Sequence, residues 1–225
     1  MLPLAVGMIA SALAPAHARP DRVGAPPHDA APGVAIGVVL AGGLGERIGG
    51  SKPLTELGGR PMITYPLAAL RAAGLHAIVL AKADSALPEL TCPVLREPEE
   101  PRHPLCGVTT ALREAAGRPV VVVGCDMPFA TASLLAWLAG LEGPVVPEVG
   151  GRLQPLLARY EPAHVGALEL ALGSGRSMHD AVLALRPHIV DEGTLRRFGD
   201  PGRLFFNVND QTDLLLAERL LLQDE

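Results

Sequence analysis

Aromatic residues and charge are both scarce in this chain: Phe, Trp and Tyr make up 3% of its 225 residues, and charged residues 19%. The net charge is -5 and the Lys and Arg residues are scattered, so nothing indicates a nucleic-acid partner. The three cysteines, Cys92, Cys106 and Cys125, are odd in number and form no CxxC pair. They predict neither a disulfide framework nor a structural zinc site, and they favour a reducing compartment, the cytoplasm.

The first 33 residues differ in composition from the rest. Residues 1–18 are apolar and end in AHA, like a signal-peptide cleavage site, but the first positive charge comes only at Arg19. This run is too short and too broken by proline to span a bilayer comfortably, and the Pro-rich stretch after it is typical of a disordered linker. We therefore expect residues 1–33 to be an extension or the product of a start site placed too far upstream, rather than an export signal. Residues 34–225 are expected to form one domain, with no membrane partner.

From residue 34 onward, continuous apolar runs rich in β-branched residues alternate with segments of helical pattern. Such an alternation predicts an α/β fold: a Rossmann-like, mostly parallel sheet with helices on both faces. Ligands of these sheets bind beyond the carboxyl ends of the strands. The predicted strands cover residues 34–41, 76–81, 92–97, 118–128 and 143–148, and the predicted helices cover 61–74, 107–117, 131–140, 178–186 and 213–222.

Several side chains suit the ends or the packing of these helices. Thr131 and Ser177 are expected N-caps, and Asp210 or Thr212 is expected to cap the last helix. That helix is apolar on most sides, which predicts that it packs on the sheet. Trp137 is expected in the core rather than on a stacking surface.

A glycine-rich turn, AGGLGERIGGSKP, follows the first predicted strand. Its GxGxxxG spacing is one residue longer than the dinucleotide fingerprint, and the next helix is expected only about ten residues later, too far for its N-terminus to meet a pyrophosphate. A P-loop fails as well, because Ser51-Lys52 stands where Lys-Ser is required. The turn nevertheless offers backbone N–H groups, the guanidinium of Arg47 and the ammonium of Lys52, all suited to phosphate oxygens.

This turn is the first of five motifs, in order, that resemble the molybdenum cofactor guanylyltransferases. LAGGLGERIGGSKPLTELGGRPMI is similar to the family signature LAGGxxxRMGxxKxLxxLxGxPLI. The chain then shows PLCG at 104–107 for PLAG, CDMP at 125–128 for (C)DxP, RLQPL at 152–156 for RxxPL, and NVN at 207–209 for NxN. The resemblance extends from about residue 34 to residue 220.

The resemblance implies a nucleotidyltransferase that moves GMP from GTP to the terminal phosphate of molybdopterin and releases pyrophosphate. Such a reaction depends on positioning and on neutralising the charge that builds on phosphate oxygens. The family's Mg²⁺ ligand corresponds to Asp126, at the end of a buried strand, where the alternative is a structural or helix-capping role. Lys52 and Arg47 correspond to the cations at the triphosphate, so the resemblance assigns catalysis to Lys52, Arg47 and Asp126.

The resemblance also implies where the nucleotide binds. Leu40, Ala41, Gly42 and Gly43 would hold guanine and ribose through main-chain atoms, and the turn ending at Gly107 would close over the nucleotide. Two places depart from the family. His103 stands where a Gly usually precedes the PLAG turn, which puts the local backbone contact in doubt. Glu100 aligns with a family Asp and either supports the ribose or a metal-bound water, or is simply solvated.

The second substrate, molybdopterin or the molybdenum cofactor, is expected to contact the C-terminal third. Arg152 could pair with one of its anionic groups, and Arg176 stands beside an expected helix N-terminus, where a plain cap is the alternative. Asn207 and Asn209 alternate on an extended segment, so both side chains face one way. They suit a pterin edge, the water shell of Mg²⁺, or turn chemistry before the last helix.

Other functions stay open from the sequence. The cytidylyl relatives typically read LAAG where this chain has LAGG, so Gly43 favours guanine over cytosine. Transfer of another nucleotide to another phosphorylated acceptor is a further alternative. A catalytically silent subunit that binds a molybdoenzyme or its chaperone is a different class, and retention of both Lys52 and Asp126 argues against it.

Overall fold

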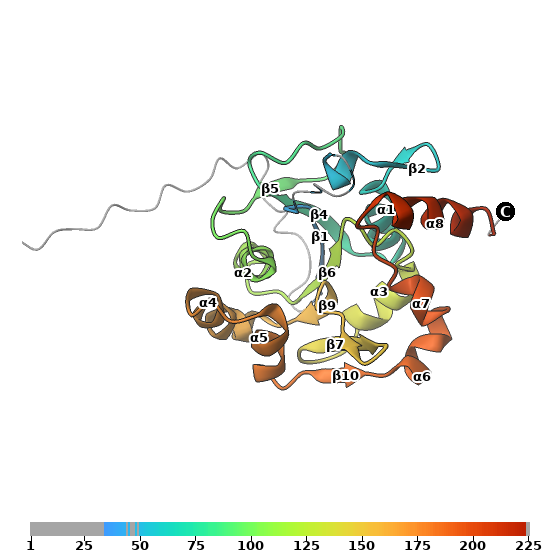
Figure 1. Ribbon diagram of the computed structural model, residues 1–225. Coiled ribbons are helices and arrows are strands. Elements are labelled where there is room, and N and C mark those ends of the chain that lie inside the picture. Colours follow the sequence, from blue (N-terminus) through green and yellow to red (C-terminus); the bar gives the residue numbers. More distant parts are fainter. Residues whose placement is uncertain (1–33, 44, 46–47, 49, 224–225) are drawn as a thin grey trace, which may run out of the picture.

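The structure of the protein, a computed structural model, describes residues 34–43, 45, 48 and 50–223 (Figure 1). The expected extension over residues 1–33 and the site residue Arg47 lie outside the described residues. The strands are β1 (Ile36–Leu40), β2 (Glu56–Leu57), β3 (Arg60–Pro61), β4 (His76–Ala81), β5 (Val94–Arg96), β6 (Val120–Gly124), β7 (Val145–Val149), β8 (Arg152–Leu153), β9 (Leu157–Tyr160) and β10 (His188–Val190). The α-helices are α1 (Thr64–Ala72), α2 (Pro104–Glu114), α3 (Ala132–Ala139), α4 (Val165–Gly173), α5 (Met178–Ala184), α6 (Glu192–Leu195), α7 (Pro201–Leu204) and α8 (Gln211–Leu221), and the 3-10 helices are η2 (Lys52–Leu54), η3 (Pro162–His164) and η4 (Arg196–Phe198).

One mixed, mostly parallel sheet forms the centre, as the sequence predicts. Its strand order is β10-β7-β9-β6-β1-β4-β5, and β8 pairs with β7 at one side. β1 lies between β4 and β6 and is parallel to both, whereas β9 runs antiparallel to β6 and β7. The chain moves from β1 to β4 and β5 on one side and then returns to place β6 on the other. The strand order therefore reverses at β1, which is where such sheets bind ligands.

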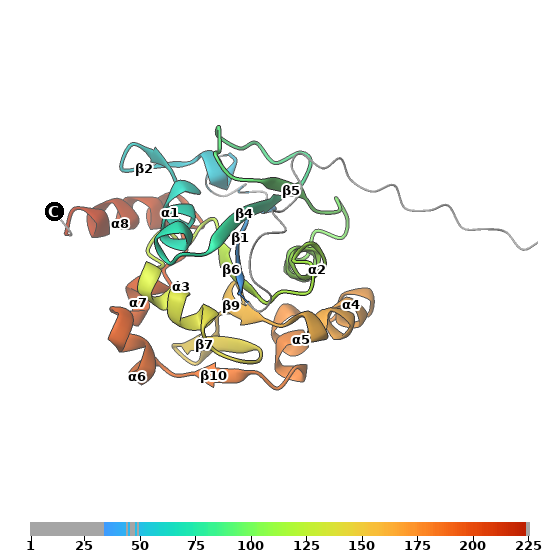
Figure 2. The same ribbon diagram turned by 180° about the vertical axis from the view of Figure 1, so that it is seen from behind.

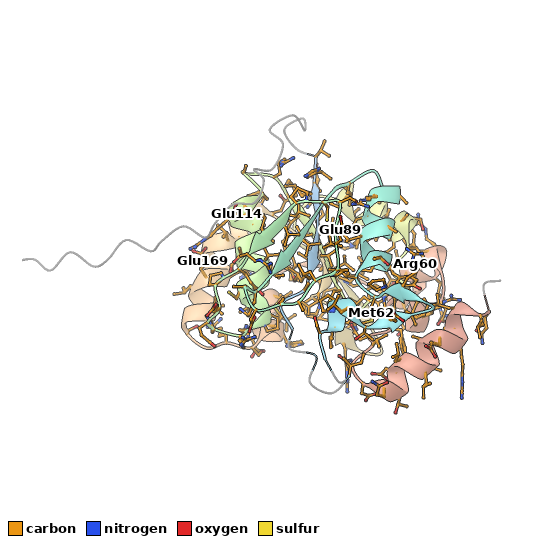
Figure 3. All side chains as sticks on the ribbon, turned by 90° about the horizontal axis from the view of Figure 1, so that it is seen from above. Arg60, Met62, Glu89, Glu114 and Glu169 are labelled. Atoms are coloured by element: carbon orange, nitrogen blue, oxygen red, sulfur yellow. The ribbon has the colours of Figure 1, made fainter. Side chains whose placement is uncertain are left out.

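Helices cover both faces of this sheet (Figures 1 and 2). One core cluster joins the sheet to α2, α4 and α5, and a second joins it to α1 and α3. Figure 3, viewed from above, shows Glu114 and Glu169 on the flank of α2 and α4, and Arg60 on the opposite flank. The strands β1, β4 and β6 are buried almost throughout, which explains their continuous runs of apolar residues.

A third, smaller core cluster lies apart from the sheet, around the two-stranded hairpin of β2 and β3. It contains Leu57 and Met62 of the hairpin region, Phe129, Val208, and Ala217 of α8. α8 therefore packs on this hairpin, and the expectation that it packs on the main sheet was wrong. The helix buries only Ala217 fully, because its apolar residues are spread around the axis rather than gathered on one face.

Two helices begin at other residues than the sequence pattern predicts. α1 begins at Thr64, because Pro61 pairs with Glu56 in the hairpin instead of opening the helix. α2 begins at Pro104, so the PLCG motif forms the first helical turn rather than a separate turn. Proline is tolerated there because the first N–H groups of a helix have no intrahelical partner.

The helix caps are largely those expected. Thr131 and Ser177 each accept a hydrogen bond from the backbone N–H three residues later, at Leu134 and Asp180. Of the two candidates for α8, Asp210 is the cap. Trp137 is only half-buried; it lies at the edge of the core, with its ring centroid 5.1 Å from that of Phe198.

No helix within the described residues is long and apolar enough to cross a bilayer.

Candidate active site

A cavity of about 280 Å³ opens where β1, β4 and β6 end. The ends are held by backbone hydrogen bonds that continue past the strands: the Cys125 N–H donates to the Leu40 carbonyl, and the Ala41 N–H donates to the Leu80 carbonyl. From the side of β1 and β6 come Leu40, Gly42, Gly43, Gly124, Cys125 and Asp126. From the side of β4, β5 and α2 come Lys82, Glu97, Arg102, His103, Pro104 and Gly107, and the lining is completed by Lys52 and Leu156.

Lys52 brings three distant parts of the sequence together at one end of this cavity. Its Nζ donates to Asp126 Oδ2 at 2.8 Å and to Asn209 Oδ1 at 2.7 Å. Lys52 is the first residue of η2, which directly follows the glycine-rich turn. Gly45 shapes that turn with a φ of +66°, and a Cβ there would come within 2.2 Å of the Gly50 carbonyl oxygen. Only glycine therefore fits residue 45 without a shift of the loop.

Asp126 is held rigidly, because the backbone on both sides of it is bonded. The Met127 N–H donates to the Gly124 carbonyl, and the Asp126 carbonyl accepts from the Val208 N–H at 2.9 Å. Val208 is fully buried in the third core cluster. Its packing, together with the hydrogen bond of its N–H, fixes the backbone that places the next residue, Asn209, beside Lys52. A Cβ on Gly124 would lie 2.5 Å from Asp126 Oδ1, so glycine leaves space for the carboxylate.

The other side of the cavity contains a second ion pair, which the sequence reasoning missed. Lys82 Nζ lies 3.7 Å from Glu97 Oε1, and the two side chains are only 3% and 6% exposed. Lys82 Nζ also donates to the Pro98 carbonyl at 2.6 Å. Burial raises the pKa of the Glu97 carboxyl, and the Lys82 ammonium opposes that rise.

The Glu97 carboxylate lies against Gly42, at the start of the glycine-rich turn. A Cβ on Gly42 would come within 1.8 Å of Glu97 Oε1, and a Cβ on Gly107 would come within 3.4 Å of Glu97 Oε2. Gly43, by contrast, has no atom within 4 Å of the place where its Cβ would be. Residue 42 is therefore glycine because of a neighbour inside the protein, whereas residue 43 faces open space in the cavity.

The structure brings together most of the residues predicted for the nucleotide. Leu40, Gly42, Gly43, Lys52, Gly107 and Asp126 all line the cavity, and Ala41 is buried beside them. Glu100 does not line it: its side chain is 79% exposed and lies 3.9 Å from Arg102. The carboxylate that lines the cavity on the side of β4 and β5 is Glu97, three residues earlier, whose N–H donates to the Ala81 carbonyl and so extends the pairing of β5 with β4.

The residues predicted to bind the acceptor are placed less uniformly. Asn209 contacts Lys52, and Asn207, two residues earlier in the sequence, is half-buried. Arg152, on β8, and Arg176, before α5, are exposed and do not line the cavity. Ser177 is the N-cap of α5: its Oγ accepts from the Asp180 N–H, and its hydroxyl donates to Asp180 Oδ2. The plain helix cap that was the alternative beside Arg176 is therefore present.

His103 has a defined structural part. Its Nδ1 accepts a hydrogen bond from the Leu105 N–H at 3.1 Å, which makes it the N-cap of α2. Its φ of -132° and ψ of 139° are extended values that any residue adopts, so the backbone does not require glycine here. His103 lines the cavity without distorting the turn that follows.

The group around Asp126 fits Mg²⁺ by its chemistry. Mg²⁺ prefers oxygen ligands and often takes one or two carboxylates, with substrate phosphates and waters completing its shell. Asp126 Oδ1 and the Asn209 amide oxygen supply such donors beside Lys52. No group of three or more His, Cys, Asp or Glu side chains suited to a metal occurs in the described part of the chain, so no all-protein cage is seen there.

Comparisons with known proteins agree with this arrangement. The model of the MobA-like NTP transferase domain matches residues 37–188. A molybdenum cofactor guanylyltransferase of Cereibacter sphaeroides is 36% identical over 200 residues, which cover 84% of this chain and 98% of that protein. A probable molybdenum cofactor guanylyltransferase of Pelotomaculum thermopropionicum is 34% identical over 187 residues, which cover 81% and 91%.

Solved structures show the same fold. Molybdopterin-guanine dinucleotide biosynthesis protein A of Archaeoglobus fulgidus superposes with a TM-score of 0.70 at 24% identity, over 83% of this chain and 98% of that one. A 2-C-methyl-D-erythritol 4-phosphate cytidylyltransferase of Thermus thermophilus superposes with a TM-score of 0.60 at 22% identity, over 83% and 98%. The family expected from the five motifs is thereby confirmed: this chain belongs to the MobA-like NTP transferases.

Proposed function

We propose that this protein transfers GMP from GTP to the terminal phosphate of molybdopterin, forming the guanine dinucleotide cofactor and pyrophosphate. Relatives named molybdenum cofactor guanylyltransferase match over most of the chain and support this activity. The observation that carries the chemistry is the contact of Lys52 with both Asp126 and Asn209 at the mouth of a glycine-lined cavity. The ammonium can neutralise phosphate oxygens directly, and the carboxylate and the amide oxygen can do so through a bound Mg²⁺.

Lys52 and Asn209 act on the phosphates. An oxygen of the acceptor phosphate attacks the α-phosphorus of GTP, the bond from that phosphorus to the bridging oxygen breaks, and pyrophosphate leaves. Negative charge grows on the bridging oxygen, and the Lys52 ammonium neutralises it. Asp126 and Asn209 each accept one of the three N–H groups of the ammonium, which leaves one donor for a phosphate oxygen. Arg47 is a second candidate cation, from outside the described residues.

Asp126, with Asn209 beside it, would hold Mg²⁺. The bound ion would supply positive charge to the α- and β-phosphate oxygens. Asp126 Oδ2 bonds Lys52, which leaves Oδ1 on the side that Gly124 keeps clear. The carboxylate thus fixes the ammonium in place while keeping a second oxygen for a ligand.

Glu97 provides the acceptor for the base. Guanine carries two adjacent donors, N1–H and the 2-amino group, which a carboxylate can accept with its two oxygens. Adenine has no N1–H, so it would leave this buried carboxylate without a hydrogen bond from the base, at a cost of about 1–3 kcal/mol. Gly43 faces the open side and lets the base approach the backbone, whereas Gly42 leaves room for the Glu97 carboxylate.

The test is pyrophosphate release with GTP, CTP or ATP in the presence of molybdopterin. We expect GTP to give the highest kcat/KM. A preference for CTP would replace the proposal with a cytidylyltransferase, for which the structural likeness to a cytidylyltransferase leaves room. Absence of release with every nucleotide would favour a binding subunit for a molybdoenzyme or its chaperone. Binding of the acceptor by Arg152, Arg176 and Asn207, and a cytoplasmic location, stay predictions.

A further inference from the structure

The chain has two lysines, Lys52 and Lys82, and both line the cavity. The proposed function gives Lys52 the phosphates but gives Lys82 no task. Taking an ammonium out of water is costly unless its partners compensate. Lys82 is nonetheless the more buried of the two, at 3% side-chain exposure against 15%. The contacts of Lys82 indicate what such a buried cation stabilises at the edge of the cavity.

Lys82 holds the loop that carries Glu97. Its Nζ donates to the Pro98 carbonyl and lies 3.7 Å from Glu97 Oε1. The contact with Glu97 is longer than a hydrogen bond, so the carboxylate retains acceptor capacity for a ligand. Because the ammonium contacts residues 97 and 98 together, it fixes both the charge and the direction of the carboxylate.

We propose that Lys82 is a positioning residue for nucleotide selection: it keeps the Glu97 carboxylate ionised and directed at the two donors of guanine. This inference rests on the proposed function, since it takes GTP as the nucleotide. Lys82 acts through Glu97, and its removal should therefore affect binding and selectivity rather than the transfer step. The phosphates and the metal belong to the other side of β1, where Lys52 and Asp126 lie.

The charged groups around Glu97 determine how GTP binding should depend on pH. The charged or titratable groups facing it are Lys82 after β4, Arg102 before α2 and Cys106 within α2, and His103 lines the same cavity. Arg102 is paired with Asp84, so Lys82 is the main compensating charge. Without it, the pKa of Glu97, already raised by burial, should rise further toward neutrality. A protonated carboxyl accepts with fewer lone pairs, so GTP binding should weaken as pH falls.

The experiment compares wild type with Lys82→Met, using GTP and inosine triphosphate, which lacks the 2-amino group. At pH 7 we expect Lys82→Met to raise KM and Kd for GTP about tenfold, the loss of one charge-assisted hydrogen bond, with kcat nearly unchanged. As the pH is lowered from 8.5 to 6, the Kd of Lys82→Met for GTP should rise further above the wild-type value, whereas the Kd of wild type should stay constant. The preference of wild type for GTP over inosine triphosphate should shrink in the variant.

Two further variants separate positioning from folding. Lys82→Arg should restore most of the GTP affinity, because it keeps the charge. The neutral pair Lys82→Met with Glu97→Gln should fold stably and bind GTP weakly, but without the pH dependence, since no carboxyl remains to titrate. Melting temperatures of all variants check the fold.

Three results would overturn the inference. They are unchanged GTP affinity in Lys82→Met, a fall in kcat alone, and a pH dependence that persists in the neutral pair. The binding measurements need no acceptor, so they test Lys82 separately from transfer. If wild type binds GTP but releases no pyrophosphate with molybdopterin, the proposed function is wrong. The GTP affinities of wild type and the Lys82 variants at each pH still decide whether Lys82 positions Glu97.

Discussion

Lys52 and Lys82 lie in the same cavity, yet their ion pairs differ in length and in exposure. Lys52 and Asp126 are 2.8 Å apart with side chains 15% and 18% exposed, whereas Lys82 and Glu97 are 3.7 Å apart and 3% and 6% exposed. The first pair is partly exposed, so in the proposed function a phosphate of GTP can take over part of its hydrogen bonding. The second is enclosed, and breaking it would leave a buried charge without a partner.

This difference suits two tasks. A group that handles developing charge must exchange partners during the reaction, and a partly exposed pair can do so at low cost. A group that reads a base gains from being fixed before the ligand arrives, because less ordering is required on binding. Substitutions that remove one pair and leave the other intact can test this division.

The largest effect is expected at the exposed pair. Asp126→Asn should lower kcat at least about a hundredfold, about 2.7 kcal/mol, because it removes the anionic group proposed to hold Mg²⁺ and the charged partner of Lys52. The fold should persist, since Asn209 still accepts from Lys52. Pyrophosphate release and the melting temperature measure the two quantities. Near-normal turnover at saturating Mg²⁺ would contradict the role of Asp126.

The enclosed pair should respond in KM instead. Glu97→Gln should raise KM for GTP about twentyfold, because a neutral amide presents only one acceptor oxygen and adds an N–H₂ group facing the donors of guanine. Glu100→Gln is the matched control, since that carboxylate is exposed and outside the cavity lining. Steady-state kinetics with GTP should leave the control at wild-type values. Equal losses in both variants would remove the distinction between the two carboxylates.

Gly42 and Gly43 are adjacent, but only Gly42 has the Glu97 carboxylate where its Cβ would lie, so alanine at each should have different effects. Gly42→Ala should displace the Glu97 carboxylate, because the new Cβ would lie 1.8 Å from Oε1, and should lower both the melting temperature and, about tenfold, the use of GTP. Gly43→Ala meets no atom within 4 Å, so its melting temperature should match wild type. Any loss of GTP use in Gly43→Ala then reports contact of the nucleotide with that residue. A lower melting temperature in Gly43→Ala would contradict this account.

The smallest effect is expected at the amide that supports Lys52. Asn209→Ala should lower kcat about fivefold, the value of one hydrogen bond, with little change in KM for GTP. Asn209→Asp separates the effect of the hydrogen-bond acceptor from that of charge, because it keeps the acceptor for Lys52 but adds a negative charge beside Asp126 and the phosphates. Single-turnover rates of both variants measure the effect. A large rise in KM for Asn209→Ala would place the amide among the nucleotide contacts instead.

Much of the fold could be read from local sequence pattern. The buried strands β1, β4 and β6 have continuous apolar runs because both of their faces are covered, and Thr131 and Ser177 cap helices through bonds that span three residues. The family followed from five motifs in order, each short enough to be read along the chain. The positions of Lys52 and Asp126 followed with them, because both lie within such motifs.

Contacts between distant segments decided the rest. Sequence alignment favoured Glu100, but the cavity contains Glu97, because β5 pairs with β4 through the bond from the Glu97 N–H to the Ala81 carbonyl. Lys82 carried no local signal, since its partners lie 15 and 16 residues away in sequence, at Glu97 and Pro98. The packing of α8 on the hairpin likewise joins residues far apart in the chain. Periodicity reports which face of an element is buried, and only the pairing of strands decides which side chains meet at their ends.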